Sequence, residues 1–235
     1  MNTTTAQSLS WMQDGQAYFL DRLKLNSDEE LHGPSRLPGW TGRHLLSHLG
    51  HNARALGRLA HWAATGEPTP MYRGPDARAK DIETGAAWTV ARLRAFVEDE
   101  HSSLADALDR FTGATWEAEV VTAQGRTVPA STIPWLRARE LWIHACDLPT
   151  GGDFADFPRG FTNALINDAL ARRATQGIDL SAQLADRAAA NDGRLAHGSG
   201  AEGSADLARW LTGRGNPEGL RTPSGRALPE LPAWL

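Results

Sequence analysis

The sequence predicts a mainly α-helical protein with a smaller α/β part, in which an N-terminal four-helix bundle precedes a small C-terminal α/β domain. Four long segments carry apolar residues at spacings of three and four, the pattern of amphipathic helices. Turn-rich connectors join them, which favours antiparallel packing in a bundle. The composition changes after Leu148, where Gly151 and Gly152 indicate a linker. We therefore expect domains at residues 1–150 and 151–235.

The predicted bundle helices cover residues 6–25, 41–64, 86–111 and 131–148. Thr41 is a suitable N-cap for the second of them. Residues 65–75 carry three prolines and two glycines and are predicted to form an irregular loop. Residues 119–130 favour β structure around a turn at Gln124-Gly125.

The C-terminal part mixes helical and extended patterns. Helices are expected at residues 161–176 and 205–212, and short strands near residues 183–187 and 194–197. This mixture is the reason for predicting an α/β domain after the linker.

The charge and composition limit the possible partners. The chain has 235 residues, a net charge of -4 and a pI near 6.1, whereas nucleic-acid modules usually carry a basic excess. It has no long apolar run and no signal-like N-terminus, so we expect a cytoplasmic protein that binds neither nucleic acid nor membrane. The single cysteine, Cys146, suits a reducing compartment. Without a sustained heptad pattern we expect a monomer.

Glu140 and His144 form two-thirds of a candidate metal site. They are four residues apart on one predicted helix, so their side chains leave the same face. The segment RHLLSHLGHN offers His44, His48 or His51 as a third ligand. Two imidazoles and one carboxylate suit a catalytic zinc ion with an open position.

Helical projection does not choose among the three histidines. His44, His48 and His51 lie together, nearly opposite the apolar stripe of their helix, which also fits a solvated histidine face. Glu140 and His144 could likewise be a surface polar pair. Cys146 lies about 160° from His144 around the helix and is better interpreted as a small buried apolar residue.

Several strings along the chain resemble mycothiol-dependent maleylpyruvate isomerases, within the wider DinB-like family of zinc-binding, thiol-dependent proteins. The similar strings are HLLSH at 44–48, TGEPTPMY at 65–72, TAQGRTVPAS at 122–131, RELWIHACDL at 139–148, GRG at 213–215 and the terminal PAWL. The resemblance spans nearly the whole chain and is weakest between about residues 177 and 200. It implies a DinB-like four-helix bundle that holds the metal.

The resemblance also implies roles for particular residues. The second histidine of HLLSH corresponds to the ligand of the family, so His48, Glu140 and His144 would bind Zn²⁺. His44 and His51 would then have secondary or surface roles. Arg214 in the GRG string would be the catalytic arginine.

The implied function is cis-trans isomerisation of maleylpyruvate to fumarylpyruvate, in gentisate-type degradation of aromatic compounds, with Zn²⁺ and mycothiol as cofactors. A mycothiol thiolate, favoured by the metal, would add to the double bond, allow rotation and then leave. The partners would be a small dicarboxylate substrate and a low-molecular-weight thiol. Two alternatives are a mycothiol S-transferase of the same family and a non-enzymatic module that binds metal or ligand.

Other polar and aromatic residues are weaker candidates. Arg126, Arg137 and Arg139 could hold the dianionic substrate or the thiol, or could simply form salt bridges or face solvent. Trp40, Trp135 and Trp142 could line the site, although packing in the core is the more common use of tryptophan.

Overall fold

The computed structural model describes residues 3–178, 180, 201–215 and 228–232. Its contacts divide the chain into two compact units, Met1–Gly152 and Asp153–Leu235. The fold is mainly α-helical, as the sequence predicts, with one small antiparallel sheet among the described residues.

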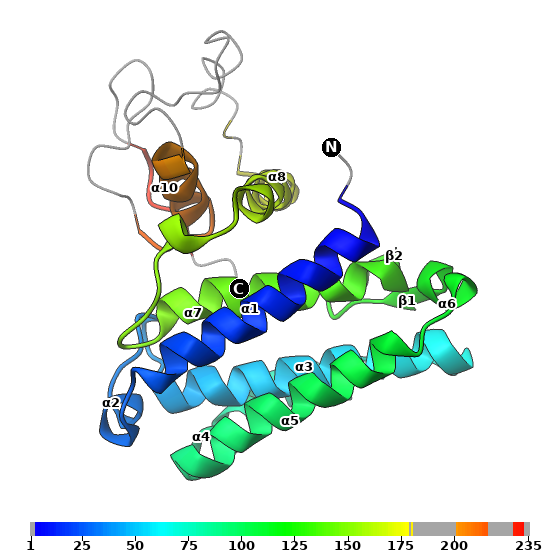
Figure 1. Cartoon of the computed structure of the whole chain (residues 1–235), viewed down its shortest axis with the longest axis horizontal. Helices are drawn as coiled ribbons and strands as arrows, with labels where there is room; N and C mark the ends of the chain where they lie inside the picture. The colour runs from blue at the N-terminus through cyan, green and yellow to red at the C-terminus, as the bar shows by residue number, and fades with distance from the viewer. Residues whose placement is uncertain (1–2, 179, 181–200, 216–227, 233–235) are drawn as a thin grey trace, which may run out of the picture. The chain divides into compact units, whose positions relative to one another are not determined.

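Four long helices form the first unit, and α3 lies between α5 and α7 (Figure 1). Helix α1 packs against α7, and α3 packs against α5, α7 and the shorter α4. The bundle helices are α1 (Thr5–Lys24), α3 (Gly42–Thr65), α5 (Val90–Asp109) and α7 (Ile133–Asp147). The four predicted bundle helices are thus confirmed, with shifted ends.

The helix starts follow local hydrogen bonding. Thr41 is the N-cap of α3, as predicted, because its side chain accepts the backbone N–H of His44 while the His44 side chain binds the Thr41 N–H. Gly66, with φ of 76°, ends the same helix in the left-handed conformation.

The third predicted helix corresponds to α5, and a separate helix that was not predicted, α4, precedes it. The α4 helix covers Ala77–Ala86, and α5 begins at Val90 because the Thr89 side chain caps the N–H of Arg92. The predicted start at residue 86 was therefore wrong. The short helices α2 (Asp28–His32) and α6 (Gly113–Glu117) were also missed, since one turn is too short to show a helical period.

A β-hairpin leads into α7. Strands β1 (Glu119–Val121) and β2 (Thr127–Pro129) pair antiparallel, with Val120 opposite Val128. Gly125 adopts φ of 74° in the predicted turn. A 3-10 turn, η1 (Ala130–Thr132), joins the hairpin directly to the start of α7, the helix that carries Glu140 and His144.

The second unit contains a 3-10 turn, η2 (Phe154–Asp156), and helices α8 (Arg159–Thr175) and α10 (Ala201–Leu211), which pack together. Arg173 links its parts, donating from Nε to the Leu211 carbonyl (3.0 Å) and from Nη2 to the Pro232 carbonyl (2.6 Å). Both helices predicted for this part are confirmed. The strands predicted near residues 183–187 and 194–197 lie outside the described residues.

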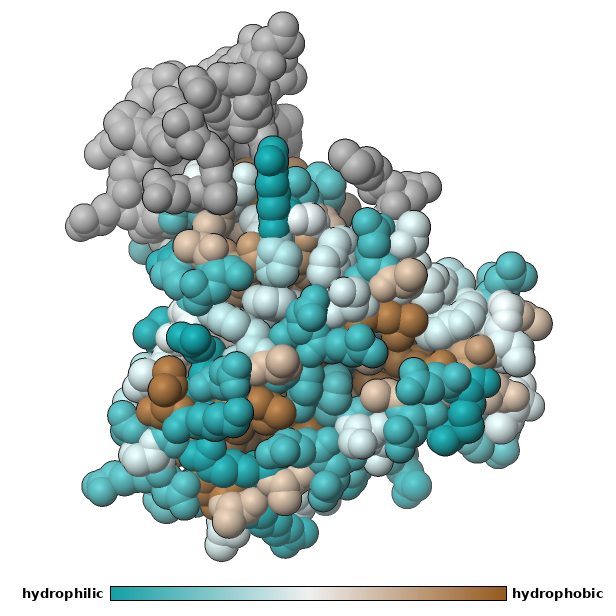
Figure 2. Space-filling model, viewed as in Figure 1, coloured by the Kyte–Doolittle hydropathy of each residue, from teal (hydrophilic) through white to brown (hydrophobic). Residues whose placement is uncertain are grey.

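The surface drawn in Figure 2 is mostly hydrophilic over the bundle, with small apolar areas between. Among the described residues, Leu25 is the one large apolar side chain that is exposed. No helix in the described part of the chain combines the length and apolar character needed to cross a membrane.

The close approach of α3 and α5 depends on Gly50, whose missing side chain leaves room for the Phe96 ring. We expect Gly50→Ala to force this ring aside and lower the free energy of unfolding by about 1–3 kcal/mol. Gly57→Ala on the same helix meets no atom within 4 Å and should stabilise by about 1 kcal/mol. Urea unfolding of both variants tests the packing, and equal effects would contradict it.

Candidate metal centre

His48 of α3 meets Glu140 and His144 of α7 inside the bundle. His48 Nε2 lies 2.8 Å from Oε2 of Glu140, and His144 Nε2 lies 3.2 Å from the same oxygen. One donor atom from each residue lies within 4.8 Å of the others. The side chains of His48 and His144 are 2% and 0% exposed and that of Glu140 is 11% exposed, so the triad opens towards solvent at the carboxylate.

The structure separates the three histidines that helical projection left together. His48 is buried, so a fully solvated histidine face is the wrong interpretation: α4, α5 and α7 surround α3. His44 stays at the helix start, where it joins the Thr41 cap and approaches Glu83 at 3.4 Å. The His51 ring packs against Phe96 and Trp88.

Asp147 orients His144 for metal binding. Nδ1 of His144 lies 2.7 Å from Oδ2 of Asp147 and donates its proton there, which leaves the lone pair on Nε2. This Nε2 is buried and has no hydrogen-bond partner, because its approach to Glu140 lacks hydrogen-bond geometry. A buried acceptor without a partner, aimed at a histidine and a carboxylate, fits a metal ion.

The charge state of the triad follows from its contacts. Burial alone would raise the pKa of Glu140, but the neighbouring imidazoles of His144 and His48 hold it well below its usual value. Burial lowers the pKa of His48 to about 4 despite the opposing effect of Glu140. Burial also opposes the charge on His144, but Asp147 and Glu140 together raise its pKa. Glu140 is therefore ionised and His48 neutral at neutral pH, as ligands should be.

The donor set fits Zn²⁺ with an open coordination position, since two imidazole nitrogens and one carboxylate oxygen are typical of catalytic sites. Cys146 is not part of it. Its thiol is buried and lies 3.7 Å from the Trp142 carbonyl, to which it donates, in agreement with the predicted role as a small buried residue.

The predicted tryptophans divide between the site and packing against α1. Trp40 presents an edge-to-face contact to His48, with ring centroids 5.5 Å apart. Trp142 stacks on Tyr18, and Trp135 packs against Trp11, both on α1. Trp40 is therefore the tryptophan of the three that lines the triad.

Two residues beside the triad, Arg78 and Tyr72, were not predicted from the sequence. Arg78 of α4 places Nη2 3.4 Å from Nδ1 of His48, and Tyr72 lies near both Arg78 and Glu140. Tyr72 lies within one of the strings that carry the family resemblance, but a lone arginine in a short polar helix carries no signal of its own.

The predicted arginines of the bundle have different surroundings. Arg126 is exposed, whereas Arg139 and Arg137 are buried. Nη1 of Arg137 donates to the Leu49 carbonyl (2.8 Å) and to Oδ1 of Asn52 (3.0 Å), so this guanidinium joins α7 to α3 rather than facing solvent. His101 lies near it and is also buried, and the charge of Arg137 adds to burial in lowering its pKa to about 3.

Arg214 belongs to the second unit and follows the end of α10. Gly213, with φ of 71°, donates its N–H to the Trp210 carbonyl, and the Arg214 N–H binds the Arg209 carbonyl. This pair of bonds is a Schellman motif, which requires a residue such as glycine in the left-handed conformation. The guanidinium also donates to the Thr212 carbonyl at 2.8 Å.

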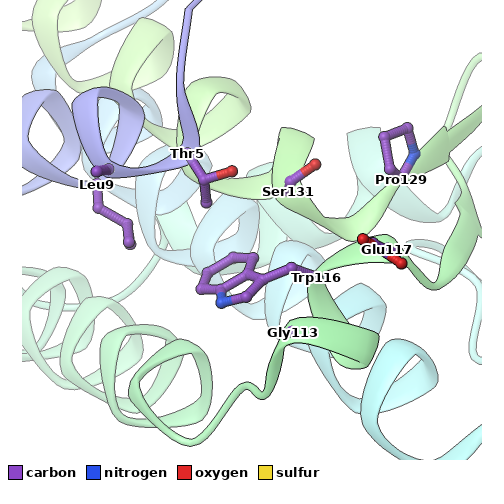
Figure 3. A pocket seen from close by; sticks show the side chains of 8 residues that line it. Thr5, Leu9, Gly113, Trp116, Glu117, Pro129 and Ser131 are labelled. Carbon is purple, nitrogen blue, oxygen red and sulfur yellow. The ribbon is translucent and has the colours of Figure 1, made fainter.

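A pocket of about 700 Å³ lies among the start of α1, α6 and the end of the hairpin (Figure 3). Its lining includes Trp116, Glu117 and Ser131 but no histidine, cysteine or triad residue. Donor chemistry, rather than pocket size, therefore identifies the candidate site.

Comparisons with known proteins agree on one family. The profile described as mycothiol maleylpyruvate isomerase N-terminal domain matches residues 13–149, which include the whole triad. A crystal structure of the mycothiol-dependent maleylpyruvate isomerase is 34% identical, with full coverage of both chains and a TM-score of 0.86. A histidine-to-alanine mutant of that isomerase gives the same values. No curated protein matches the chain.

We predict that His144→Ala abolishes stable metal binding, because a three-ligand site that loses one donor holds its ion poorly. Asp147→Asn should weaken binding about 10- to 100-fold, since it removes only the group that orients His144. Metal content after dialysis, with a chelator competition, measures both effects. His44→Ala is the matched control and should keep its metal. Undiminished metal in His144→Ala would contradict the site.

His101 predicts acid sensitivity of the fold. Its pKa of about 3 lies below the ordinary histidine value, so the unfolded chain binds a proton that the folded chain excludes. The resulting stability is present above about pH 6.5 and is lost as the pH falls. Between about pH 7 and about pH 5 this group should cost about 2 kcal/mol.

The measurement is urea unfolding at both pH values. His101→Leu should lose about 2 kcal/mol less than the original chain on acidification, whereas His32→Leu, at an exposed position, should not differ from it. The same pH dependence in His101→Leu and the original chain would show that His101 does not titrate on unfolding.

Proposed function

We infer the function of this chain from its family: it belongs to the mycothiol-dependent maleylpyruvate isomerase family. We propose that it converts maleylpyruvate to fumarylpyruvate with mycothiol as the thiol cofactor, in gentisate-type degradation of aromatic compounds. The observation that carries this proposal is the buried triad of His48, Glu140 and His144 within the residues that match the family. These three residues are proposed to hold Zn²⁺.

A zinc ion held there would favour the thiolate form of mycothiol at neutral pH, because the positive charge of the metal stabilises the anion. Glu140 supplies one negative charge and the two imidazoles supply none, so the ligand set leaves a net positive charge at the centre. The side chains of both histidines are buried, so most of the site is shielded from solvent.

The reaction proposed here needs a nucleophile because the cis double bond cannot rotate while it is intact. The thiolate adds to the double-bond carbon beside the terminal carboxylate, and the π electrons move onto the ketone oxygen as an enolate. The former double bond is now single and rotates. The enolate then re-forms the ketone and the double bond, and the carbon–sulfur bond breaks with its electron pair returning to sulfur.

Arg214 is proposed as the catalytic arginine. A guanidinium is permanently charged and planar, which suits the developing enolate oxygen or a substrate carboxylate. Its backbone is held in the turn after α10, because the two Schellman hydrogen bonds restrain Gly213 and Arg214.

The direct test mixes maleylpyruvate with zinc-loaded protein, with and without mycothiol, and follows the double-bond geometry by NMR. We expect fumarylpyruvate to appear only when both the metal and the thiol are present, with the thiol recovered unchanged. A stable thiol adduct would instead indicate a transferase. No product from protein with verified metal would contradict the proposal.

Variants of Arg214 separate catalysis from metal binding in the same assay. Arg214→Ala should keep its zinc and lose most of its turnover, and Arg214→Lys should recover only part, because lysine lacks the planar fork. Full activity of Arg214→Ala would remove the arginine from the mechanism.

A further inference from the structure

Arg78 is a half-buried cation without an acidic partner. It lies in the first turn of α4, and its Nη2 is 3.4 Å from Nδ1 of His48. Among the described residues no carboxylate lies within ion-pair distance of this guanidinium, although the chain carries more acidic than basic residues. A guanidinium that contacts a candidate metal ligand and has no counter-ion is suited to an incoming anion.

The segment that carries Arg78 is held in place by polar contacts. Met71 is buried before it; its carbonyl accepts from Nη1 of Arg58 (3.3 Å) and its sulfur from the Ala123 N–H (3.2 Å). After Arg78, the Ile82 carbonyl of α4 accepts from the Ser47 hydroxyl of α3 at 2.8 Å. The guanidinium is thus presented from a fixed backbone.

Tyr72 adds a neutral donor at the same place. Burial, together with nearby Glu140, raises the pKa of its hydroxyl to about 12 against the opposing charge of Arg78. The phenol therefore keeps its proton at neutral pH and can donate it. Glu140 is the triad member with the most exposed side chain, so Tyr72 and Arg78 lie near the side from which a ligand enters.

Metal binding would release Arg78 from its contact with His48. His48 now accepts the Arg78 N–H at Nδ1 and donates from Nε2 to Glu140. A metal bound at Nε2 needs the lone pair there, so the imidazole proton must reside on Nδ1. Nδ1 can then no longer accept from Arg78, and the guanidinium is available for another acceptor.

We propose that Arg78, assisted by the Tyr72 hydroxyl, forms a carboxylate-binding subsite beside the triad and binds the substrate carboxylate next to the double bond. This inference rests on the proposed function. The carbon that the thiolate attacks bears this carboxylate, so of the two carboxylates it is the one nearest the sulfur. Its negative charge also repels the thiolate, and a guanidinium beside the metal ligands offsets that repulsion.

The test compares kinetics with maleylpyruvate at saturating mycothiol. Arg78→Met should lower kcat/KM about 10- to 100-fold, the range expected for a lost charged hydrogen bond, and Arg78→Lys should recover part of it. Lys80→Met, which removes an equal charge from an exposed position of the same helix, should match the original chain. Zinc content should not fall in Arg78→Met, because no metal ligand is lost.

A substrate analogue distinguishes the two carboxylates. With a methyl group in place of the carboxylate farther from the double bond, Arg78→Met should show the same fold loss. If Arg78→Met loses no kcat/KM with this analogue, Arg78 binds the carboxylate farther from the double bond, and the proposed assignment is wrong.

A binding measurement separates this inference from the proposed function. Calorimetric titration with maleate, a dicarboxylate with a cis double bond, should detect binding to the zinc-loaded original chain and to Lys80→Met but not to Arg78→Met. Equal maleate affinity in all three proteins would overturn the subsite, even if the isomerase assay succeeds. If the isomerase assay fails, loss of maleate binding in Arg78→Met still supports the subsite.

Discussion

One buried carboxylate, Glu140, fixes how helices α3 and α7 cross. An ionised carboxylate is costly to remove from water unless charged or polar groups surround it, and here His48 approaches from one helix and His144 from its own. Removing one partner of such a buried set typically costs about 3–5 kcal/mol. The bundle therefore depends on keeping both imidazoles against the same oxygen.

The residues around the triad act as its support. Asp147 at the end of α7 orients His144, and the backbone N–H of Arg36 donates to the Asp147 carbonyl at 2.8 Å. Trp40, from the same connector, packs on His48. Both candidate histidine ligands are thus held by packing or by a second hydrogen bond, as a pre-organised site requires. The support comes from the connector between α2 and α3 as much as from the long helices.

The sequence predicted the strongest periodic features and missed those that depend on tertiary contacts. The i, i+4 spacing of Glu140 and His144 and the Thr41 cap are local, so they could be read directly. The burial of His48 could not, because its face looks polar until α4 and α7 cover it. His48 was singled out by family resemblance rather than by geometry. Arg78 could not be identified from the sequence, because only its short distance to His48 indicates a role in the site.

We propose above all that the buried triad holds a metal with a position open to a thiol. X-ray absorption at the zinc edge of the loaded protein, before and after mycothiol is added, tests this most directly. We expect nitrogen and oxygen ligands alone at first and one additional sulfur ligand with mycothiol. An unchanged spectrum, or a sulfur ligand already present without thiol, would contradict it.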